Sequence, residues 1–242
     1  MLSGISRDLH VAVIGAHGGI GAALVEAVTG LDQVAIVSTF ARSFSQQHHT
    51  ENPKLNAGIL DLLDPASISA AAASLDSPLD LVIVATGLLH EPERDIRQLD
   101  AAKLALNFAI NATGPALVAQ AFLPKLRTDR RTVFAALSAR VGSIGDNRLG
   151  GWYAYRASKA ALNQLVRTLA IEHGRKNPLG VCVGLHPGTV DTALSKPFQR
   201  GVTANKLFTP AYSAARLLEV IDRLTPADSG GLFAWDGERV AP

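Results

Sequence analysis

The sequence predicts a doubly wound α/β fold, in which a parallel sheet carries helices on both faces. Short apolar runs recur along the chain, and segments with a helical repeat of apolar residues lie between them. Runs of consecutive apolar residues bounded by Gly, Pro or Asp are typical of strands covered on both faces, as in parallel sheets. Strands that alternate with helices in this way predict the doubly wound arrangement.

Six apolar runs are the expected strands of the sheet, at residues 10–15, 33–39, 79–87, 131–139, 179–188 and 230–236. A further short strand precedes Asp61. The helical repeats predict helices over 20–30, 64–75, 99–126 and 153–174. The one long connection without a clear period follows the fifth run. We expect it to form a substrate lid over 192–210, because long loops inside compact domains are usually functional or disordered.

Length and composition limit the class of protein. A chain of 242 residues with 48% hydrophobic and 18% charged residues suits one soluble globular domain spanning 1–242. No cluster of Lys and Arg with interleaved aromatic residues favours nucleic acid as a partner. A lone cysteine, Cys182, cannot form an internal disulfide and is expected in the core. We expect no metal site, no signal peptide and no membrane span, and a location in the cytoplasm.

A glycine-rich turn follows the first expected strand and opens a helix. Gly15, Gly19 and Gly21 follow the spacing Gly-x-x-x-Gly-x-Gly. Such a turn presents backbone N–H groups and the positive end of a helix to a pyrophosphate, and the missing side chains allow a close approach. Taken alone, the pattern also suits a turn that simply needs glycine.

The end of the second strand bears on the choice of cofactor. No Asp or Glu stands there to bind the 2′-hydroxyl of NAD, whereas Arg42 and neighbouring hydroxyl groups favour the 2′-phosphate of NADP(H). Arg42 could equally be a surface charge. Asp61 could meet the adenine amino group or cap the helix that starts near Pro65, although Asp64 is better placed as the cap.

Polar residues that could take part in catalysis lie in the expected helix 99–126, at the end of the fourth expected strand and in the expected helix 153–174. Ser138 stands at the carboxyl end of an expected strand, where open α/β sheets bind ligands. Tyr155 and Lys159 are four residues apart and so share one helix face. Asn111 precedes Gly and Pro at a place where the helix should bend or loosen. An isolated Tyr and Lys at this spacing would usually mean only an amphipathic helix.

The whole set resembles the short-chain dehydrogenase/reductase family, and the resemblance rests on Gly15-x-x-x-Gly19-Ile20-Gly21, Asn111, Ser138, Tyr155-x-x-x-Lys159 and Pro187-Gly188. It covers nearly the whole chain, in the family's order and spacing. The stretch from Ser138 to Asn163 and the ending Trp-Asp-Gly-Glu resemble the C-factor-like and sniffer-like carbonyl reductase branch. The resemblance implies a Rossmann-type fold and hydride transfer between a nicotinamide and a carbonyl or alcohol.

The resemblance also implies roles for the polar residues. Tyr155 would be the general acid and base, and the ammonium group of Lys159 would lower the pKa of the phenol and bind the nicotinamide ribose. Ser138 would hold the carbonyl oxygen, and Asn111 would hold a water of a proton relay. Tyr153 is a nearby rival for the acid, but it lies off the face of Lys159 and is assigned to packing or to the pocket.

The expected cofactor contacts extend along the chain. Besides Tyr155 and Lys159, they are Gly15, His17, Gly19, Ile20, Gly21, Arg42, Asp61, Leu62, Ala85, Thr86, Gly87, Pro187, Gly188, Val190 and Thr192. His17 either bonds a phosphate or is simply exposed, and His186 is expected to be structural. Where the family usually has Asn-Asn-Ala-Gly, this chain has Val-Ala-Thr-Gly at 84–87. The close approach at Gly87 is kept, whereas the Asn that ties strands together is lost.

These features predict an NADP(H)-dependent oxidoreductase acting on a small carbonyl or alcohol substrate. The alternative is a non-catalytic dinucleotide-binding protein with a signalling or regulatory role, of the C-factor type. The resemblance implies a homodimer or homotetramer formed through the two long helices, while a monomer stays open.

Overall fold

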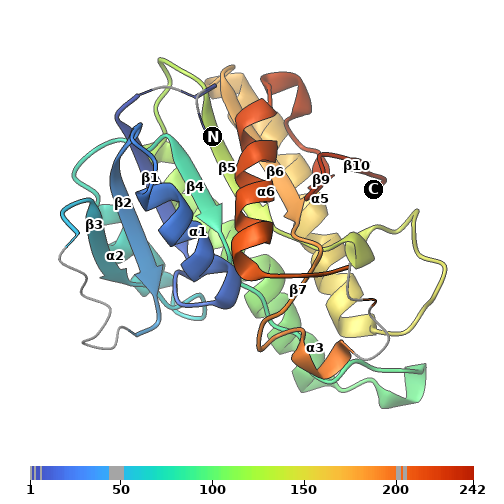
Figure 1. Cartoon of the computed structure of the whole chain (residues 1–242). Helices are drawn as coiled ribbons and strands as arrows, with labels where there is room; N and C mark the ends of the chain where they lie inside the picture. The colour runs from blue at the N-terminus through green and yellow to red at the C-terminus, as the bar shows by residue number, and fades with distance from the viewer. Residues whose placement is uncertain (1, 3, 6, 44–51, 200–202, 204–205) are drawn as a thin grey trace.

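A single sheet organises the part of the chain that the computed structural model describes, which is residues 2, 4–5, 7–43, 52–199, 203 and 206–242. Within these residues eight strands lie in the order β10-β9-β6-β5-β4-β1-β2-β3 (Figure 1). Neighbouring strands are parallel, except that β10 runs antiparallel to β9. The strands are β1 (Leu9–Ile14), β2 (Val34–Ala41), β3 (Leu55–Ile59), β4 (Leu81–Val84), β5 (Thr132–Leu137), β6 (Gly180–His186), β9 (Leu232–Ala234) and β10 (Arg239–Val240).

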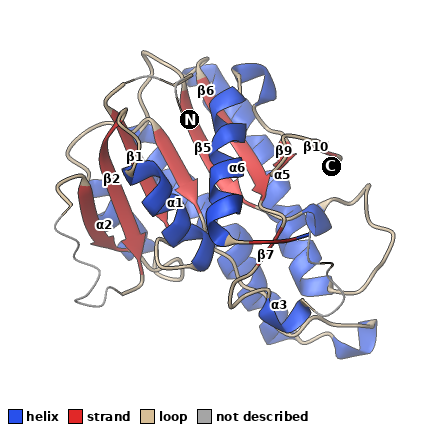
Figure 2. Ribbon diagram, in the orientation of Figure 1, coloured by secondary structure: helices blue, strands red, loops and turns tan. Residues whose placement is uncertain are grey.

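Helices cover both faces of the sheet, as the alternation of strands and helices predicts (Figure 2). The helices α1 (Gly19–Thr29) and α6 (Pro210–Arg223) pack on one face, where Leu24, Val28 and Leu217 join the first core. The second core forms on the other face, beneath α2 (Pro65–Ala73), α4 (Gly114–Phe122) and α5 (Tyr153–Lys176). Burial of these apolar side chains is the main favourable term in folding. The predicted fold class is therefore confirmed.

The long helix that the sequence predicts over 99–126 is interrupted. It consists of α3 (Ala101–Phe108), a π-helical turn (Ala109–Thr113), α4, and a short 3₁₀ turn (Leu123–Lys125). A π turn widens the helix by one residue and occurs frequently at functional sites. The prediction that the helix loosens at Asn111 is correct.

Some elements were not predicted from the sequence. Helix α6 is one of them. Others are a 3₁₀ turn (Lys196–Phe198) and β8 (Leu207–Phe208), which lie in the segment 196–210 that was expected to be irregular. Strand β8 pairs with β7 (Thr189–Val190) in a separate two-stranded sheet. Of the predicted lid, residues 200–202 and 204–205 lie outside the described part. Three further 3₁₀ turns span Ile96–Gln98, Arg140–Gly142 and Pro226–Asp228.

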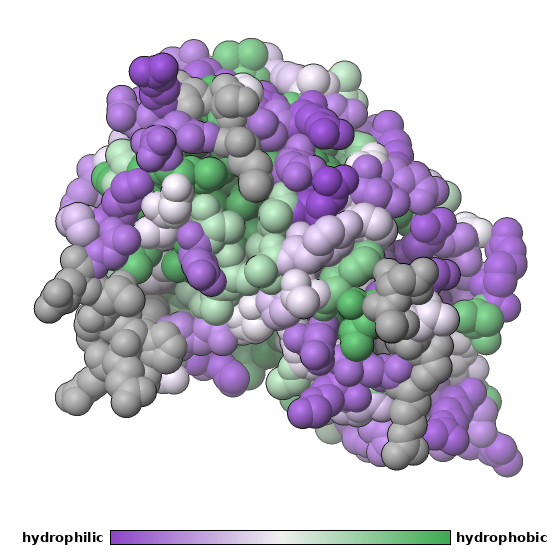
Figure 3. Space-filling view, viewed as in Figure 1, coloured by the Kyte–Doolittle hydropathy of each residue, from purple (hydrophilic) through white to green (hydrophobic). Residues whose placement is uncertain are grey.

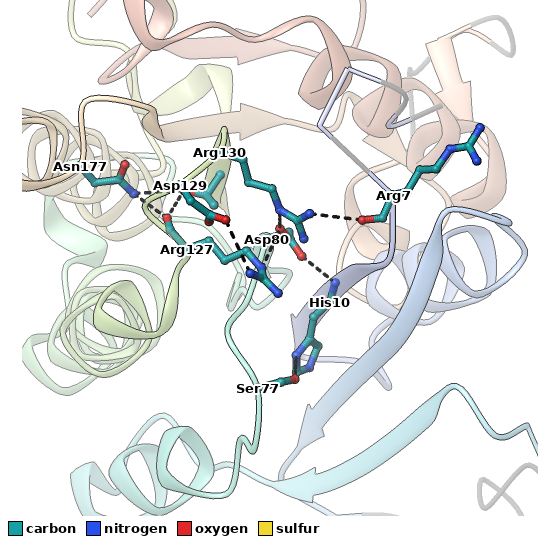
Figure 4. A network of polar contacts seen from close by, with 9 residues as sticks. Arg7, His10, Ser77, Asp80, Arg127, Asp129, Arg130 and Asn177 are labelled. Atoms are coloured by element: carbon teal, nitrogen blue, oxygen red, sulfur yellow. Dashed lines mark hydrogen bonds and ion pairs between the residues drawn. The ribbon is translucent and has the colours of Figure 1, made fainter.

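The amino edge of the sheet is tied together by a buried carboxylate. Asp80, directly before β4, accepts hydrogen bonds from the backbone N–H of His10 at 2.9 Å and from Nε of Arg130 at 2.7 Å (Figure 4). Arg127 Nε lies 3.7 Å from the same carboxylate. The His10 ring is within hydrogen-bond distance of the hydroxyls of Ser38 and Ser77, at 2.8 Å each. These contacts hold β1, β2 and the start of β4 in place relative to one another near the amino edge of the sheet.

The surface over α1 and α6 is mixed in character. Figure 3 shows hydrophilic residues over most of the rim of this face and a paler, partly apolar band across its centre. Among the described residues, no helix is both long enough and apolar enough to cross a bilayer.

Candidate functional site

A cleft opens at the carboxyl ends of β1 and β4, where the order of the strands reverses. Ligands bind at this position in open α/β sheets because the connections leave the two strands in opposite directions. The cleft holds about 380 Å³. Its lining brings together predicted cofactor residues from distant parts of the chain, namely Gly15, His17, Arg42, Asp61, Leu62, Ala85, Thr86 and Gly87.

The floor of the cleft admits only glycine at two positions. Gly15 has φ +85°, and a Cβ there would lie 2.8 Å from Cγ2 of Thr86. A Cβ on Gly21 would lie 2.0 Å from the carbonyl oxygen of Gly15. The hydroxyl of Thr86 is buried and has no hydrogen-bond partner among the described residues. A bare backbone at the start of α1 beside an unpaired hydroxyl fits the binding of a dinucleotide.

Two acidic residues, Asp61 and Asp64, have different hydrogen-bonding roles near the cleft. Asp64 caps α2, because its side chain accepts a hydrogen bond from the N–H of Ala66 at 2.9 Å. The sequence-based choice of this cap is confirmed. Asp61 instead accepts from the N–H of Leu63 at 2.9 Å and lines the cleft. Arg42, exposed directly after β2, lines the same cleft.

Asn111 sits in the π turn and is fully buried. Its side chain holds the loop after β4 by two hydrogen bonds to Leu88: Nδ2 donates to the carbonyl oxygen and Oδ1 accepts from the N–H, each at 2.8 Å. Nδ2 also reaches the hydroxyl of Ser158 on α5, at 3.1 Å. The loop therefore has a polar anchor although the chain lacks the usual Asn after β4.

Tyr155 and Lys159 project from the first two turns of α5. Lys159 Nζ lies 5.9 Å from the centroid of the Tyr155 ring and donates to the carbonyl oxygen of Leu137 at 2.7 Å. A Cβ on Gly87 would lie 3.8 Å from both Lys159 Nζ and Asn111 Oδ1. Gly87 lines the cleft, so the lysine and the asparagine lie directly behind its wall.

Burial controls the protonation of this pair in the free protein. It raises the pKa of Tyr155 to about 12 and lowers the pKa of Lys159 to about 7. In the free protein burial outweighs any lowering of the phenol pKa by Lys159, because the loss of hydration disfavours the charged form of each group. Tyr155 consequently keeps its proton at neutral pH, while the charge of Lys159 depends on pH.

Ser138 is hydrogen-bonded to another residue of α5. Phe134 and Ala136 of β5 face the second core, and Ser138 continues this alternation beneath α5. Its hydroxyl donates to Oδ1 of Asn163 at 2.6 Å. Asn163 comes eight residues after Tyr155, which is about 12 Å along the helix axis. Sequence reasoning missed Asn163, although its spacing from Tyr155 and Lys159 puts it on the same side of α5.

The remaining predicted residues lie on the other side of the glycine turn. A Cβ on Gly19 would lie 2.6 Å from Cγ2 of Thr192, so the segment after β7 packs directly on the turn. Gly188, with φ +78°, packs against Phe208. Pro187 accepts a hydrogen bond from the hydroxyl of Ser213, Val190 ends β7, and Ile20 packs on the first core.

Cys182 is buried, His186 is partly buried, and both are neutral near pH 7. Burial lowers the pKa of His186 to about 4 and raises the pKa of the Cys182 thiol to about 12. The expected core position of Cys182 is confirmed. Neither side chain is suited to proton transfer near neutral pH.

The chain belongs to the short-chain dehydrogenase family, since the family model for short chain dehydrogenases matches residues 9–202. The C-signal protein of Myxococcus xanthus is 41% identical over 144 residues, which are 59% of this chain and 80% of that protein. The NADPH-bound carbonyl reductase from chicken fatty liver has a TM-score of 0.88 at 28% identity, covering 98% of this chain and 96% of that one. The carbonyl reductase Sniffer of D. melanogaster has the same fold, with a TM-score of 0.86 at 23% identity and coverage of 98% and 100%.

These similarities confirm the family and branch that the sequence predicts. The protein is an oxidoreductase whose fold binds a nicotinamide dinucleotide.

Proposed function

We propose that the protein is an NADP(H)-dependent oxidoreductase that interconverts a small carbonyl compound and its alcohol. One observation carries the proposal. Lys159 Nζ and Asn111 Oδ1 converge on Gly87 at the dinucleotide cleft, and Tyr155 stands beside Lys159 on the same helix. A binding protein would need the cleft but would have no use for an acid held next to a buried lysine.

Reduction of a carbonyl adds two electrons and two protons in all. A bound NADPH would supply the hydride, which forms the new C–H bond as the C=O π bond breaks. Tyr155 donates the proton that the carbonyl oxygen needs, and the phenolate left behind regains a proton from solvent. Because its pKa in the free protein is raised, Tyr155 holds that proton until the oxygen becomes basic enough to take it.

Lys159 contributes charge at the moment of transfer. Its ammonium group favours the phenolate that forms when Tyr155 gives up its proton. Leu137 O holds the group in place on one side, and the residue is buried, so bulk water screens it little. Asn111 fixes the loop that carries Gly87 and Leu88 and keeps this wall of the cleft rigid.

Tyr155 is the proposed hydrogen-bond donor to the carbonyl oxygen, because the hydroxyl of Ser138 already has a partner in Asn163. A serine hydroxyl has one hydrogen to donate, and that of Ser138 goes to Asn163 on the covered side of β5. In this proposal Ser138 links β5 and α5, and its sequence-based role as holder of the carbonyl stays a prediction.

Arg42 supports the choice of NADP(H). Replacing it by Ala should weaken NADPH binding about tenfold and leave NADH binding within about twofold, because only NADPH carries a 2′-phosphate for the guanidinium. Titrations followed by nucleotide fluorescence measure both affinities. Arg97→Ala, which removes an exposed arginine outside the cleft, serves as the control. Equal losses for both nucleotides would assign the 2′-phosphate to another residue.

A non-catalytic role is the second candidate, and the similarity to the C-signal protein favours keeping it. The two are separated by mixing the purified protein with NADPH and a panel of ketones, aldehydes and quinones, and identifying the alcohol formed. The proposal expects stoichiometric oxidation of NADPH with at least one of them. Tight binding of NADPH without any alcohol product would favour the non-catalytic role.

A further inference from the structure

The chain enters α5 through a left-handed turn that its own side chains do not cap. Gly150, Gly151 and Trp152 follow one another with φ of +65°, +63° and +55°. Glycine takes up this left-handed region readily, whereas a bulky residue there is strained. Trp152 is the N-cap residue of α5, and its side chain makes no capping hydrogen bond. A strained residue persists only where its surroundings hold it, and the first N–H groups of a helix need acceptors from elsewhere.

Glu93, in the loop after β4, supplies two such acceptors. Its carbonyl oxygen accepts a hydrogen bond from the N–H of Trp152 at 2.6 Å, and its carboxylate accepts one from the N–H of Ala154 at 3.3 Å. A Cβ on Gly151 would lie 3.1 Å from the same carbonyl oxygen, so this glycine lets the two loops touch. The cap of α5 therefore comes from a loop that is distant in the sequence.

The burial of Glu93 gives this cap weight. Glu93 is only 6% exposed, and no Lys, Arg or His of the described residues forms an ion pair with it. Glutamate is almost never fully buried unless it is paired. Here the carboxylate lies at the N-terminus of a helix of 24 residues, whose free N–H groups carry a partial positive charge. The start of α5 thus takes the place of a cation.

A second contact ties the same loop to α5 one turn further on. Asn111 bonds both backbone groups of Leu88, and its Nδ2 reaches the hydroxyl of Ser158 at 3.1 Å. That hydroxyl donates to the carbonyl oxygen of Tyr155 at 3.0 Å. The loop therefore holds α5 at two places, through Glu93 before Tyr155 and through Asn111 after it.

The loop begins at the wall of the dinucleotide cleft. Gly87 lines the cleft, and a Cβ on it would lie 3.8 Å from Lys159 Nζ. One short loop thus connects the cleft wall to the helical turn that carries Tyr155. Such a connection matters for chemistry, because misplacing a reacting group by about 1 Å can slow a reaction about a hundredfold.

We propose that Glu93 is a positioning residue: its carboxylate caps α5 from the loop after β4 and so holds the hydroxyl of Tyr155 at a fixed place relative to the cleft. Glu93 acts only through α5 and moves no proton. The inference rests on the proposed role of Tyr155 and deepens it, since it names the residue that orients the acid.

Glu93→Met and Glu93→Gln separate the cap from the volume of the side chain. Methionine fills a similar space but offers only a weak acceptor, whereas glutamine keeps an amide oxygen. Each protein with NADPH bound is mixed with a ketone that the wild type reduces, and the oxidation of NADPH is followed over one turnover. Glu93→Met should be slower by about tenfold or more, with NADPH affinity and the KM for the ketone within about threefold. Glu93→Gln should keep the wild-type rate within about threefold.

Hydrogen exchange at the N–H groups of Trp152 and Ala154 tests the cap in the free protein, without any reaction. Exchange at these two groups should be about tenfold faster or more in Glu93→Met and close to the wild type in Glu93→Gln, because only the former loses the acceptor. Glu91→Met, at an exposed position of the same loop, is the matched control and should change neither exchange nor turnover.

The two measurements distinguish the ways in which the inference can fail. A wild-type turnover rate in Glu93→Met, or equal slowing by Met and Gln, would overturn the positioning role while carbonyl reduction stands. Unchanged hydrogen exchange in Glu93→Met would overturn the cap itself. A wild type that reduces no carbonyl would overturn the proposed function and the positioning role together, whatever the exchange shows.

Discussion

At the scale of single residues, the environment of a side chain decides what it can do. Tyr155 and Lys159 have the spacing of an acid and its activator. In the free protein burial raises the pKa of Tyr155 and lowers the pKa of Lys159, so that the neutral form of each is favoured. Ser138 has the expected position at the end of β5, and the structure adds a hydrogen bond from its hydroxyl to Asn163. The spacing of residues along one helix was predictable, whereas the partner of a strand-end side chain on another element was not.

Ser138→Ala tests this reading of the serine. We expect the rate of carbonyl reduction to fall less than about fivefold, and the free energy of unfolding to fall by about 1 kcal/mol, because one buried hydrogen bond is lost. Asn163→Ala should have the same effects, and the double variant should be no worse than either single one, since both remove one interaction. Steady-state kinetics and urea unfolding give these values. A loss of about a hundredfold or more in Ser138→Ala alone would restore the serine as a catalytic donor.

At the scale of elements, the glycine turn and α1 could be predicted because their requirement is local. The tight contact between Gly15 and Gly21 needs bare backbone whatever the rest of the fold does. The loosened helix at Asn111 was predictable for a similar reason, from the Gly and Pro that follow it. The left-handed turn before α5 was not, because the contacts with Glu93 that hold Trp152 come from a distant loop.

Gly21→Ala tests the role of the turn. A Cβ there would lie 2.0 Å from the carbonyl oxygen of Gly15, so α1 or the turn must move. We expect NADPH affinity to fall about tenfold or more and Tm to decrease. The matched control is Gly30→Ala at the other end of α1, where φ is −74° and a Cβ would lie 3.6 Å from the carbonyl oxygen of Glu26. That variant should bind NADPH normally and be more stable by about 0.4–1 kcal/mol. Normal NADPH affinity in Gly21→Ala would contradict the account of the cleft.

At the scale of the whole molecule, the two edges of the sheet have different roles. The carboxyl edge holds the cleft and the proposed reaction centre, whereas the amino edge holds the buried carboxylate of Asp80 and its arginines. The predicted location in the cytoplasm and the predicted homodimer or homotetramer stay predictions. The carbonyl or alcohol substrate also stays a prediction, because its chemical class is inferred from the site and not from the fold.

Asp80→Asn tests the separation of stability from function. Removing the charge leaves the guanidinium groups of Arg127 and Arg130 facing a neutral amide, and we expect a loss of about 2–3 kcal/mol in the free energy of unfolding. This is less than for a fully buried pair, because both arginines are partly in water. NADPH affinity should stay within about twofold. Asp129→Asn, whose carboxylate is 70% exposed, should change stability little. A large loss of NADPH affinity in Asp80→Asn would show that the two edges are coupled.

Proton transfer from Tyr155 is the central claim, and a single-turnover measurement on Tyr155→Phe tests it most directly. The variant keeps the aromatic ring and removes only the acid. Each protein with NADPH bound is mixed with acetophenone or another ketone that the wild type reduces, and the oxidation of NADPH is followed over one turnover. We expect the variant to bind NADPH within about threefold of the wild type and to oxidise it at least about a hundredfold more slowly. Oxidation at the wild-type rate would contradict the claim.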